Sequence, residues 1–114
     1  MTKVYVVNKG GHNYADAERF GQIVFCTEGT IDKLDTAQMY RELNQSFQGS
    51  NPEDYIVLTS LASLCSVACA MFANKHGTLN LLIHTGDGYI ARHLNLKDRQ
   101  RGKSKTARLL SGGD

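Results

Sequence analysis

Residues 54–77, DYIVLTSLASLCSVACAMFANKHG, decide the fold expected for this chain. The segment opens with the apolar run 55–58, which has the length and the β-branched character of a buried strand. After this run the apolar residues recur at helical spacing, and Gly77 supplies a stop signal for a helix over 61–75. Both halves are apolar on nearly every side. We therefore expect a central strand that leads directly into a central helix.

The rest of the chain repeats the same two patterns. Residues 4–7, 23–26 and 79–84 read as further strands, and Thr-Gly-Asp-Gly at 85–88 predicts a hairpin to a last strand at 89–94. Strands that alternate with helices are typical of a parallel sheet covered on both faces. We expect an α/β fold, a small Rossmann-like three-layer sandwich with four parallel strands in the order 2-1-3-4 and an antiparallel edge strand.

Two more helices fill the gaps between the strands. The first, over 15–20, should end at Gly21 in the left-handed conformation that often follows a helix. The second should begin at Asp35 as its N-cap, with Gln38 three residues later as an approximate capping box. The apolar stripe of the second helix should consist of Met39, Tyr40, Leu43 and Phe47.

Length and composition describe a single globular domain. The chain has 114 residues, of which 41% are hydrophobic and 21% charged, and both fractions are ordinary. No apolar run approaches the ~20 residues of a membrane span, and the N-terminus lacks a signal-peptide layout, so a cytoplasmic location is expected. The three cysteines are an odd number in apolar surroundings, which favours reduced thiols over a disulfide framework.

The net charge of +2 is unevenly distributed along the chain. Residues 97–114 hold six basic and two acidic side chains, a charge of +4, which leaves −2 for residues 1–96. We therefore expect one α/β domain over 1–96 and a basic, flexible tail over 97–114. The tail is either a solvated end or a contact for nucleic acid. Its candidate contact residues are Lys97, Arg99, Arg101, Lys103, Lys105 and Arg108.

Polar residues follow each predicted parallel strand, so they should line one edge of the sheet. That edge includes the switch point between the first and third strands, where ligands of such sheets usually bind. The Gly10-Gly11 pair lets a backbone approach a ligand, and the amino end of the central helix offers N–H groups to an anion. The candidate ligand-binding residues are Lys9, Gly10, Gly11, His12, Thr27, Glu28, Thr59, Ser60, Ser63 and His84.

These residues favour a non-catalytic binding protein that takes a nucleotide-type or other anionic small ligand, without a metal or cofactor. Neither a Walker motif nor a Gly-x-Gly-x-x-Gly motif is present. The alternative interpretation is that Gly10-Gly11 is a plain turn and that Ser60 is a plain N-cap. Two further functions stay open. One is an accessory protein that binds a host protein or nucleic acid through its surface and basic tail. The other is an enzyme that acts on a phosphorylated substrate and uses His12, Glu28 and His84. A homodimer is a further possibility.

The segments VYVVNKGGHNYADAERFG and DYIVLTSLASLCSVACAMFANKHG resemble segments of small uncharacterised phage-encoded α/β proteins. The resemblance spans roughly the first 94 residues. It implies no activity and no site residues. It does imply that the protein acts inside an infected bacterium, in the host cytoplasm.

Overall fold

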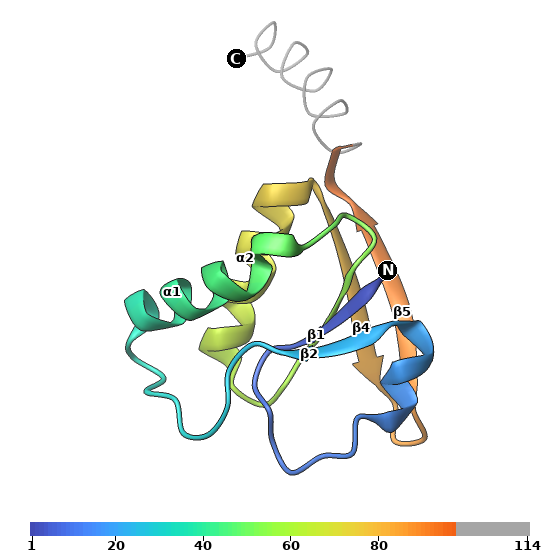
Figure 1. Cartoon of the computed structure of the whole chain (residues 1–114), viewed down its shortest axis with the longest axis horizontal. Coiled ribbons are helices and arrows are strands. Elements are labelled where there is room, and N and C mark those ends of the chain that lie inside the picture. The colour runs from blue at the N-terminus through green and yellow to red at the C-terminus, as the bar shows by residue number, and fades with distance from the viewer. Residues whose placement is uncertain (98–114) are drawn as a thin grey trace, which may run out of the picture.

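The computed structural model describes residues 1–97, and in it five strands form one mixed sheet (Figure 1). The order across the sheet is β2-β1-β3-β4-β5, in which the first four strands are parallel to one another and β5 is antiparallel to β4. The expected order 2-1-3-4 with a hairpin strand at the edge is confirmed. The strands are β1 (Lys3–Val6), β2 (Gln22–Phe25), β3 (Tyr55–Val57), β4 (Thr78–His84) and β5 (Tyr89–Asn95).

Among residues 1–97, four helical segments connect the strands. They are the 3-10 helices η1 (Ala15–Phe20) and η2 (Phe47–Gly49) and the α-helices α1 (Thr36–Ser46) and α2 (Ala62–His76). In Figure 1, α1 and α2 lie together on one side of the sheet and η1 lies on the other. The predicted tail lies outside the described residues, except for Lys97.

Alternation along the strands sends side chains into two separate cores. Tyr5 and Ile56 face α1 and α2, whereas the adjacent Val6 and Val57 face η1. The larger core, on the side of the α-helices, contains Tyr5, Val7, Met39, Leu43, Phe47, Ile56, Leu64, Ala68 and Phe72. The smaller core contains Val4, Val6, Tyr14, Ala17, Val57, Leu82 and Tyr89.

The second face of the sheet is covered more thinly than the expected three-layer sandwich requires. Within residues 1–97, that face is covered by the six residues of η1 and the loop before it, and Ala17 is the one buried residue of this helix. The α-helices of this part of the chain, α1 and α2, pack on the first face. The physical reason is length, because the connection between β1 and β2 is too short for a helix of several turns after its polar loop.

The central segment folds as its sequence predicts. β3 pairs with β1 on one side and with β4 on the other, so it is interior. Leu64, Ala68 and Phe72 of α2 are fully buried, and α2 ends at Gly77, whose φ of 70° is in the left-handed region. Glycine adopts that conformation at little cost, which explains the stop at this position.

Three local expectations need correction. Gly21 has a φ of 160° and is extended, not left-handed, and it is needed because a Cβ at this position would lie 2.5 Å from the carbonyl oxygen of Thr2. Asp35 does cap α1 by accepting from the Gln38 N–H at 3.0 Å, but the Gln38 side chain bonds Glu42 and so does not close a capping box. Tyr40 is 54% exposed and does not belong to the apolar stripe.

Candidate functional site

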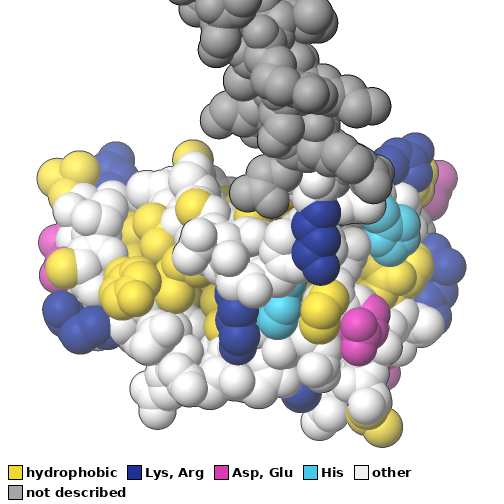
Figure 2. Space-filling model, turned by 90° about the horizontal axis from the view of Figure 1, so that it is seen from above, with side chains coloured by type: hydrophobic (Ala, Val, Ile, Leu, Met, Phe, Trp, Pro, Cys, Tyr) yellow, Lys and Arg dark blue, Asp and Glu magenta, His cyan; other side chains and the backbone are white. Residues whose placement is uncertain are grey.

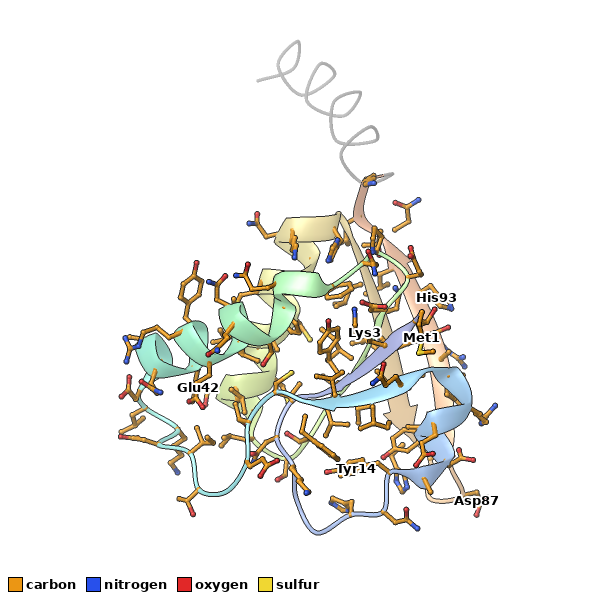
Figure 3. The ribbon with its side chains drawn as sticks, viewed as in Figure 1. Met1, Lys3, Tyr14, Glu42, Asp87 and His93 are labelled. Carbon is orange, nitrogen blue, oxygen red and sulfur yellow. The ribbon has the colours of Figure 1, made fainter. Side chains whose placement is uncertain are left out.

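The carboxyl ends of the four parallel strands meet at one edge of the sheet, as the candidate site requires. η1 follows β1 on one face of the sheet and α2 follows β3 on the opposite face. The chain therefore turns toward opposite faces after these two neighbouring strands. Divergence of this kind creates the switch point at which open α/β sheets bind ligands. This edge lies at the lower end of the molecule in Figures 1 and 3.

The exit of β1 is joined to the exit of β2. The Lys9 N–H donates to the carbonyl oxygen of Thr27 at 2.8 Å, and Lys9 and Glu28 form an isolated parallel bridge. The Thr27 hydroxyl is buried and lies 2.8 Å from the carbonyl oxygen of Val7 and 2.9 Å from Asn8 Oδ1. Thr27 therefore braces the two exit loops, and its hydroxyl is already engaged within the protein.

A hollow of about 330 Å³ opens beside the β1 exit loop, and we call it the Lys9 hollow. Lys9 Nζ lies 5.0 Å from the centre of the Phe25 ring, within cation–π range. The Tyr14 ring packs edge-on against Phe25, and the Tyr14 hydroxyl accepts from the Gly10 N–H at 3.3 Å. The hollow is lined by Lys9, Gly10, His12, Asn13, Tyr14, Ala15, Glu18, Ile23 and Phe25.

Three of the predicted residues, Lys9, Gly10 and His12, thus line one hollow. Sequence reasoning missed the other residues of the lining, among them Tyr14, Glu18 and Phe25. Tyr14 carried a usable signal, because it is a lone aromatic residue in a loop of polar residues and glycines. Phe25 and Glu18 carried none, since only the tertiary structure brings β2 and η1 beside that loop.

The start of α2 is the second part of the predicted site. Leu61 occupies the N-cap position, and its side chain cannot cap the helix. Ser63 donates to the carbonyl oxygen of Lys33 at 3.0 Å and so anchors a different loop. Within residues 1–97, the N–H groups of Ala62, Ser63 and Leu64 have no protein partner, and N–H groups at such a helix end favour an anion.

Ser60 is therefore not the cap of α2, which the alternative interpretation had required. It is exposed and precedes Leu61, which takes the cap position instead. Thr59 is turned toward the helix, because its N–H donates to Cys65 Sγ at 3.3 Å and the Cys65 thiol donates back to the Thr59 carbonyl oxygen at 3.3 Å. This reciprocal pair connects the end of β3 to the first turn of α2.

The three residues of the enzyme hypothesis do not meet in the described structure. His84 Nδ1 accepts from the Gly86 N–H at 3.4 Å, and the His84 ring packs against Tyr89. His12 lies near Tyr14, and Glu28 is held in the bridge with Lys9. No contact among residues 1–97 joins His12, Glu28 and His84, so the structure offers no acid–base pair among them.

The thiols of Cys26 and Cys69 are poorly suited to nucleophilic chemistry. All three cysteines are free, and burial raises the pKa of Cys26 to about 12 and that of Cys69 to about 11. A thiol with so high a pKa stays protonated at neutral pH and is a weak nucleophile. Within residues 1–97, no group of three or more His, Cys, Asp and Glu side chains is placed to hold a metal ion.

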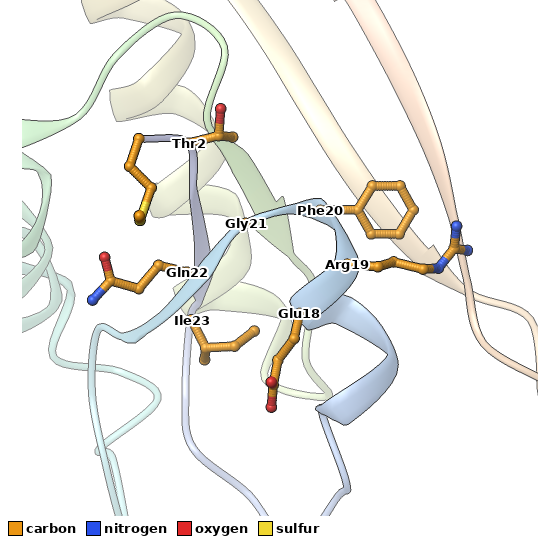
Figure 4. Close-up of a pocket in the computed structure, with 8 residues that line it drawn as sticks. Thr2, Glu18, Arg19, Phe20, Gly21, Gln22 and Ile23 are labelled. Carbon is orange, nitrogen blue, oxygen red and sulfur yellow. The ribbon is translucent and has the colours of Figure 1, made fainter.

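A second hollow, of about 560 Å³, lies at the opposite end of η1 (Figure 4). It is formed where Met1 and Thr2 meet the turn from η1 into β2. Figure 4 shows Arg19 and Phe20 pointing toward β5 and Gln22 pointing the other way. None of the predicted site residues lines this hollow.

None of the helices described within residues 1–97 combines the length and the apolar character needed to span a membrane.

The sheet and its helices define a mixed α/β protein with a candidate anion-binding edge at its switch point. The chain belongs to the Phage Pam3 gp32-like protein family, whose family model matches residues 2–96. This match confirms the resemblance to small phage-encoded proteins. No curated protein and no solved structure matched the chain.

Proposed function

We propose that this phage protein is a non-catalytic binding protein that takes a nucleotide-type or other anionic small ligand where β1 and β3 leave the sheet. One observation carries the proposal: α2 begins at the switch point without a side-chain cap. The dipole of a 15-residue helix and the N–H groups of Ala62, Ser63 and Leu64 then favour a negative charge, by about 0.3–1 kcal/mol at an exposed site.

The topology supports a Rossmann-like interpretation of the fold. The order β2-β1-β3-β4 with connections on opposite faces is the arrangement of doubly wound sheets. Lys9 adds a positive charge at the exit of β1, and the Gly11 backbone is open, since a Cβ there would meet nothing within 4 Å. The host cytoplasm, where nucleotides are abundant, is the proposed location.

A thermal-shift panel of nucleotides and cyclic nucleotides tests this proposal. A ligand present at a hundred times its Kd stabilises the native state by ~2.7 kcal/mol, which is easily measured. Ala62→Asp places a carboxylate in the first turn of α2 and should abolish the shift. Ala37→Asp, an exposed alanine in the first turn of α1, is the matched control and should preserve it. Equal shifts in the two variants, or no shift with any nucleotide, would contradict the proposal.

A second candidate function, binding of another protein, is favoured by an exposed apolar patch on β4 and β5. Ile83, Ile90 and Leu94 are 42%, 43% and 48% exposed. Ile83 is directly opposite Ile90, and Leu94 is opposite the half-buried Leu79, so all four lie on the face that bears the α-helices. The patch is adjacent to the sheet edge, where α2 no longer covers the strands.

Light scattering over a range of protein concentrations distinguishes a homodimer from a host-protein partner. If the patch joins two copies, Ile90→Lys should yield a monomer, whereas Leu34→Lys, at an exposed leucine elsewhere, should leave the dimer intact. A wild-type monomer at every concentration would exclude the homodimer. The nucleic-acid alternative depends on Lys97, Arg99, Arg101, Lys103, Lys105 and Arg108, of which only Lys97 lies within the described residues.

A further inference from the structure

A third hollow, of about 460 Å³, lies at the end of the sheet opposite the switch point, where β3 and β4 begin and β5 ends. We call it the His93 hollow. Its lining includes Glu53, Tyr55, Asn80, His93 and Lys97. Figure 2 looks onto this end of the molecule and shows histidine, basic and acidic side chains at its surface. His93, on β5, is labelled in Figure 3.

The orientation of the Asn80 side-chain amide is fixed by its surroundings. Asn80 is 6% exposed, and its Nδ2 donates to the carbonyl oxygen of Pro52 at 2.6 Å and to that of Asp54 at 2.9 Å. Both amide hydrogens are therefore used, and only the oxygen remains to face β5. Because an amide oxygen can only accept, any group bonded to it must donate.

That group is His93, whose Nδ1 lies 2.9 Å from Asn80 Oδ1. The neutral His93 ring must consequently carry its hydrogen on Nδ1, which leaves the lone pair on Nε2. Within residues 1–97, Nε2 makes no hydrogen bond. The protein thus uses a buried amide to direct His93 Nε2, a hydrogen-bond acceptor without a partner among residues 1–97, toward the hollow.

The remaining lining specifies what such an acceptor would bind. Glu53 supplies further acceptor oxygens and a negative charge that opposes anions, while Lys97 balances that charge and donates. The Tyr55 ring lies 5.7 Å from the His93 ring and is tilted by 54°, so it adds an aromatic wall. A fitting ligand is neutral, donates several hydrogen bonds, accepts one or two, and has an apolar ring face.

We propose that the His93 hollow binds a polyhydroxylated ring, such as a sugar or the ribose of a nucleoside, with a ring hydroxyl donating to His93 Nε2. Glu53 accepts from a neighbouring hydroxyl, and Lys97 donates to a ring or hydroxyl oxygen. The C–H face of the ring packs on Tyr55. This site is separate from the proposed anion site, because it lies where β3 and β4 begin, not where they end.

The tautomer of His93 is tested first, by long-range ¹H–¹⁵N spectra above pH ~8.5, where imidazoles are neutral. The expected result is a hydrogen on Nδ1 for His93 in the wild-type protein. A hydrogen on Nε2, the form that leaves the Asn80 oxygen without a donor, would overturn the proposal.

Ligand binding is then measured by chemical-shift titration with methyl glucopyranoside and, separately, with adenosine. We expect saturable shifts at His93 and Tyr55 with at least one probe, and the probe that binds identifies a hexose or a ribose as the source. The absence of saturable shifts with both probes would overturn the proposal.

Two substitutions separate the nitrogen atoms of the ring. In His93→Asn the side-chain amide can donate to Asn80 in place of Nδ1, but the variant has no acceptor atom at the position of Nε2. Binding at least tenfold weaker than that of the wild type is therefore expected. In His93→Gln the longer amide places an oxygen near Nε2, and most of the affinity should return. Arg92→Gln, one residue earlier on β5 with its side chain on the opposite face, is the control and should bind like the wild type. Equal affinity of His93→Asn and the wild type would overturn the proposal.

Discussion

The Asp16 carboxylate on η1 accepts a hydrogen bond from the Tyr89 N–H at 3.1 Å, although the two residues are 73 positions apart. Arg19, one helical turn later, donates to the carbonyl oxygen of the same Tyr89 at 2.9 Å. Tyr89 is the first residue of β5, and its N–H and C=O point away from β4. These two side chains of η1 therefore occupy backbone groups of an edge strand that would otherwise be open to another chain.

Removal of this contact should loosen the β4–β5 hairpin. Asp16→Ala is expected to lower the free energy of unfolding by about 1 kcal/mol, because the carboxylate bonds a backbone N–H but is half exposed. Urea unfolding measures the loss, and amide hydrogen exchange at Tyr89 should accelerate. Glu18→Ala, an exposed acidic residue of the same helix, is the control. Equal stability of the two variants would show that the hairpin does not depend on η1.

The two glycines of the N-terminal region should respond very differently to an added methyl group. In Gly21→Ala the new Cβ would lie 2.5 Å from the carbonyl oxygen of Thr2, so β1 and β2 must shift apart, at a cost of about 1–3 kcal/mol. In Gly11→Ala the Cβ would meet nothing within 4 Å, and the change should stay within about 0.5 kcal/mol. Thermal or urea unfolding measures the free energy of unfolding of both variants. A similar loss of stability in the two would show that the close approach of Gly21 to Thr2 does not require glycine.

The stability of the protein should fall below pH ~6.5 in a manner that depends on His76. Burial lowers the pKa of His76 in the native state, and the neighbouring Lys75 lowers it further, while Asp54 and Glu53 partly oppose this. As the pH falls through 6.5, the unfolded chain takes up a proton that native His76 resists, so the free energy of unfolding decreases.

Urea unfolding at several pH values tests this dependence. His76→Gln retains a donor toward Ser50, which lies 2.8 Å from His76 Nε2, and it should lose less stability between pH 7.5 and 5 than the wild type. A variant with the same pH dependence as the wild type would show that other groups cause the decrease.

The thiols of Cys26 and Cys69 should react slowly in the native protein. Because burial raises the pKa of Cys26 to about 12 and that of Cys69 to about 11, both are almost entirely protonated at pH 8. Labelling of these two residues with a thiol reagent should therefore proceed far more slowly in the native state than in urea. Rapid labelling of Cys26 or Cys69, located by peptide mass spectrometry, would contradict this expectation.

Much of the fold is predictable because it depends on local patterns. The apolar run before Thr59, the helical spacing up to Phe72 and the stop at Gly77 all lie within one segment, and the structure contains the predicted strand and helix. The Asp35 cap was likewise readable from two residues three positions apart. The need for glycine at position 21 was not readable, because it comes from the backbone of Thr2, just before β1, and not from the end of the helix η1.

The candidate site was predictable only as an edge of the sheet. Parallel strands must place Lys9, Thr27, Thr59 and His84 at the same edge, whatever their side chains do. Whether a hydroxyl is free depends on its partners, and Thr27 and Ser63 are engaged by the carbonyl oxygens of Val7 and Lys33. Nothing in the sequence reveals such partners, since they are distant along the chain.

The order of strands and helices was predictable from the sequence, because apolar periodicity and turn residues are local features of the chain. The resemblance to small phage-encoded proteins was also visible in the sequence, and the family match confirms it. Which polar groups remain available depends instead on tertiary packing. That packing places Asn80 so that two carbonyl oxygens orient its amide, and the amide oxygen then lies 2.9 Å from His93 Nδ1. Such a chain of hydrogen bonds joins residues of β4, β5 and the turn before β3, and it exists only once these segments are packed together.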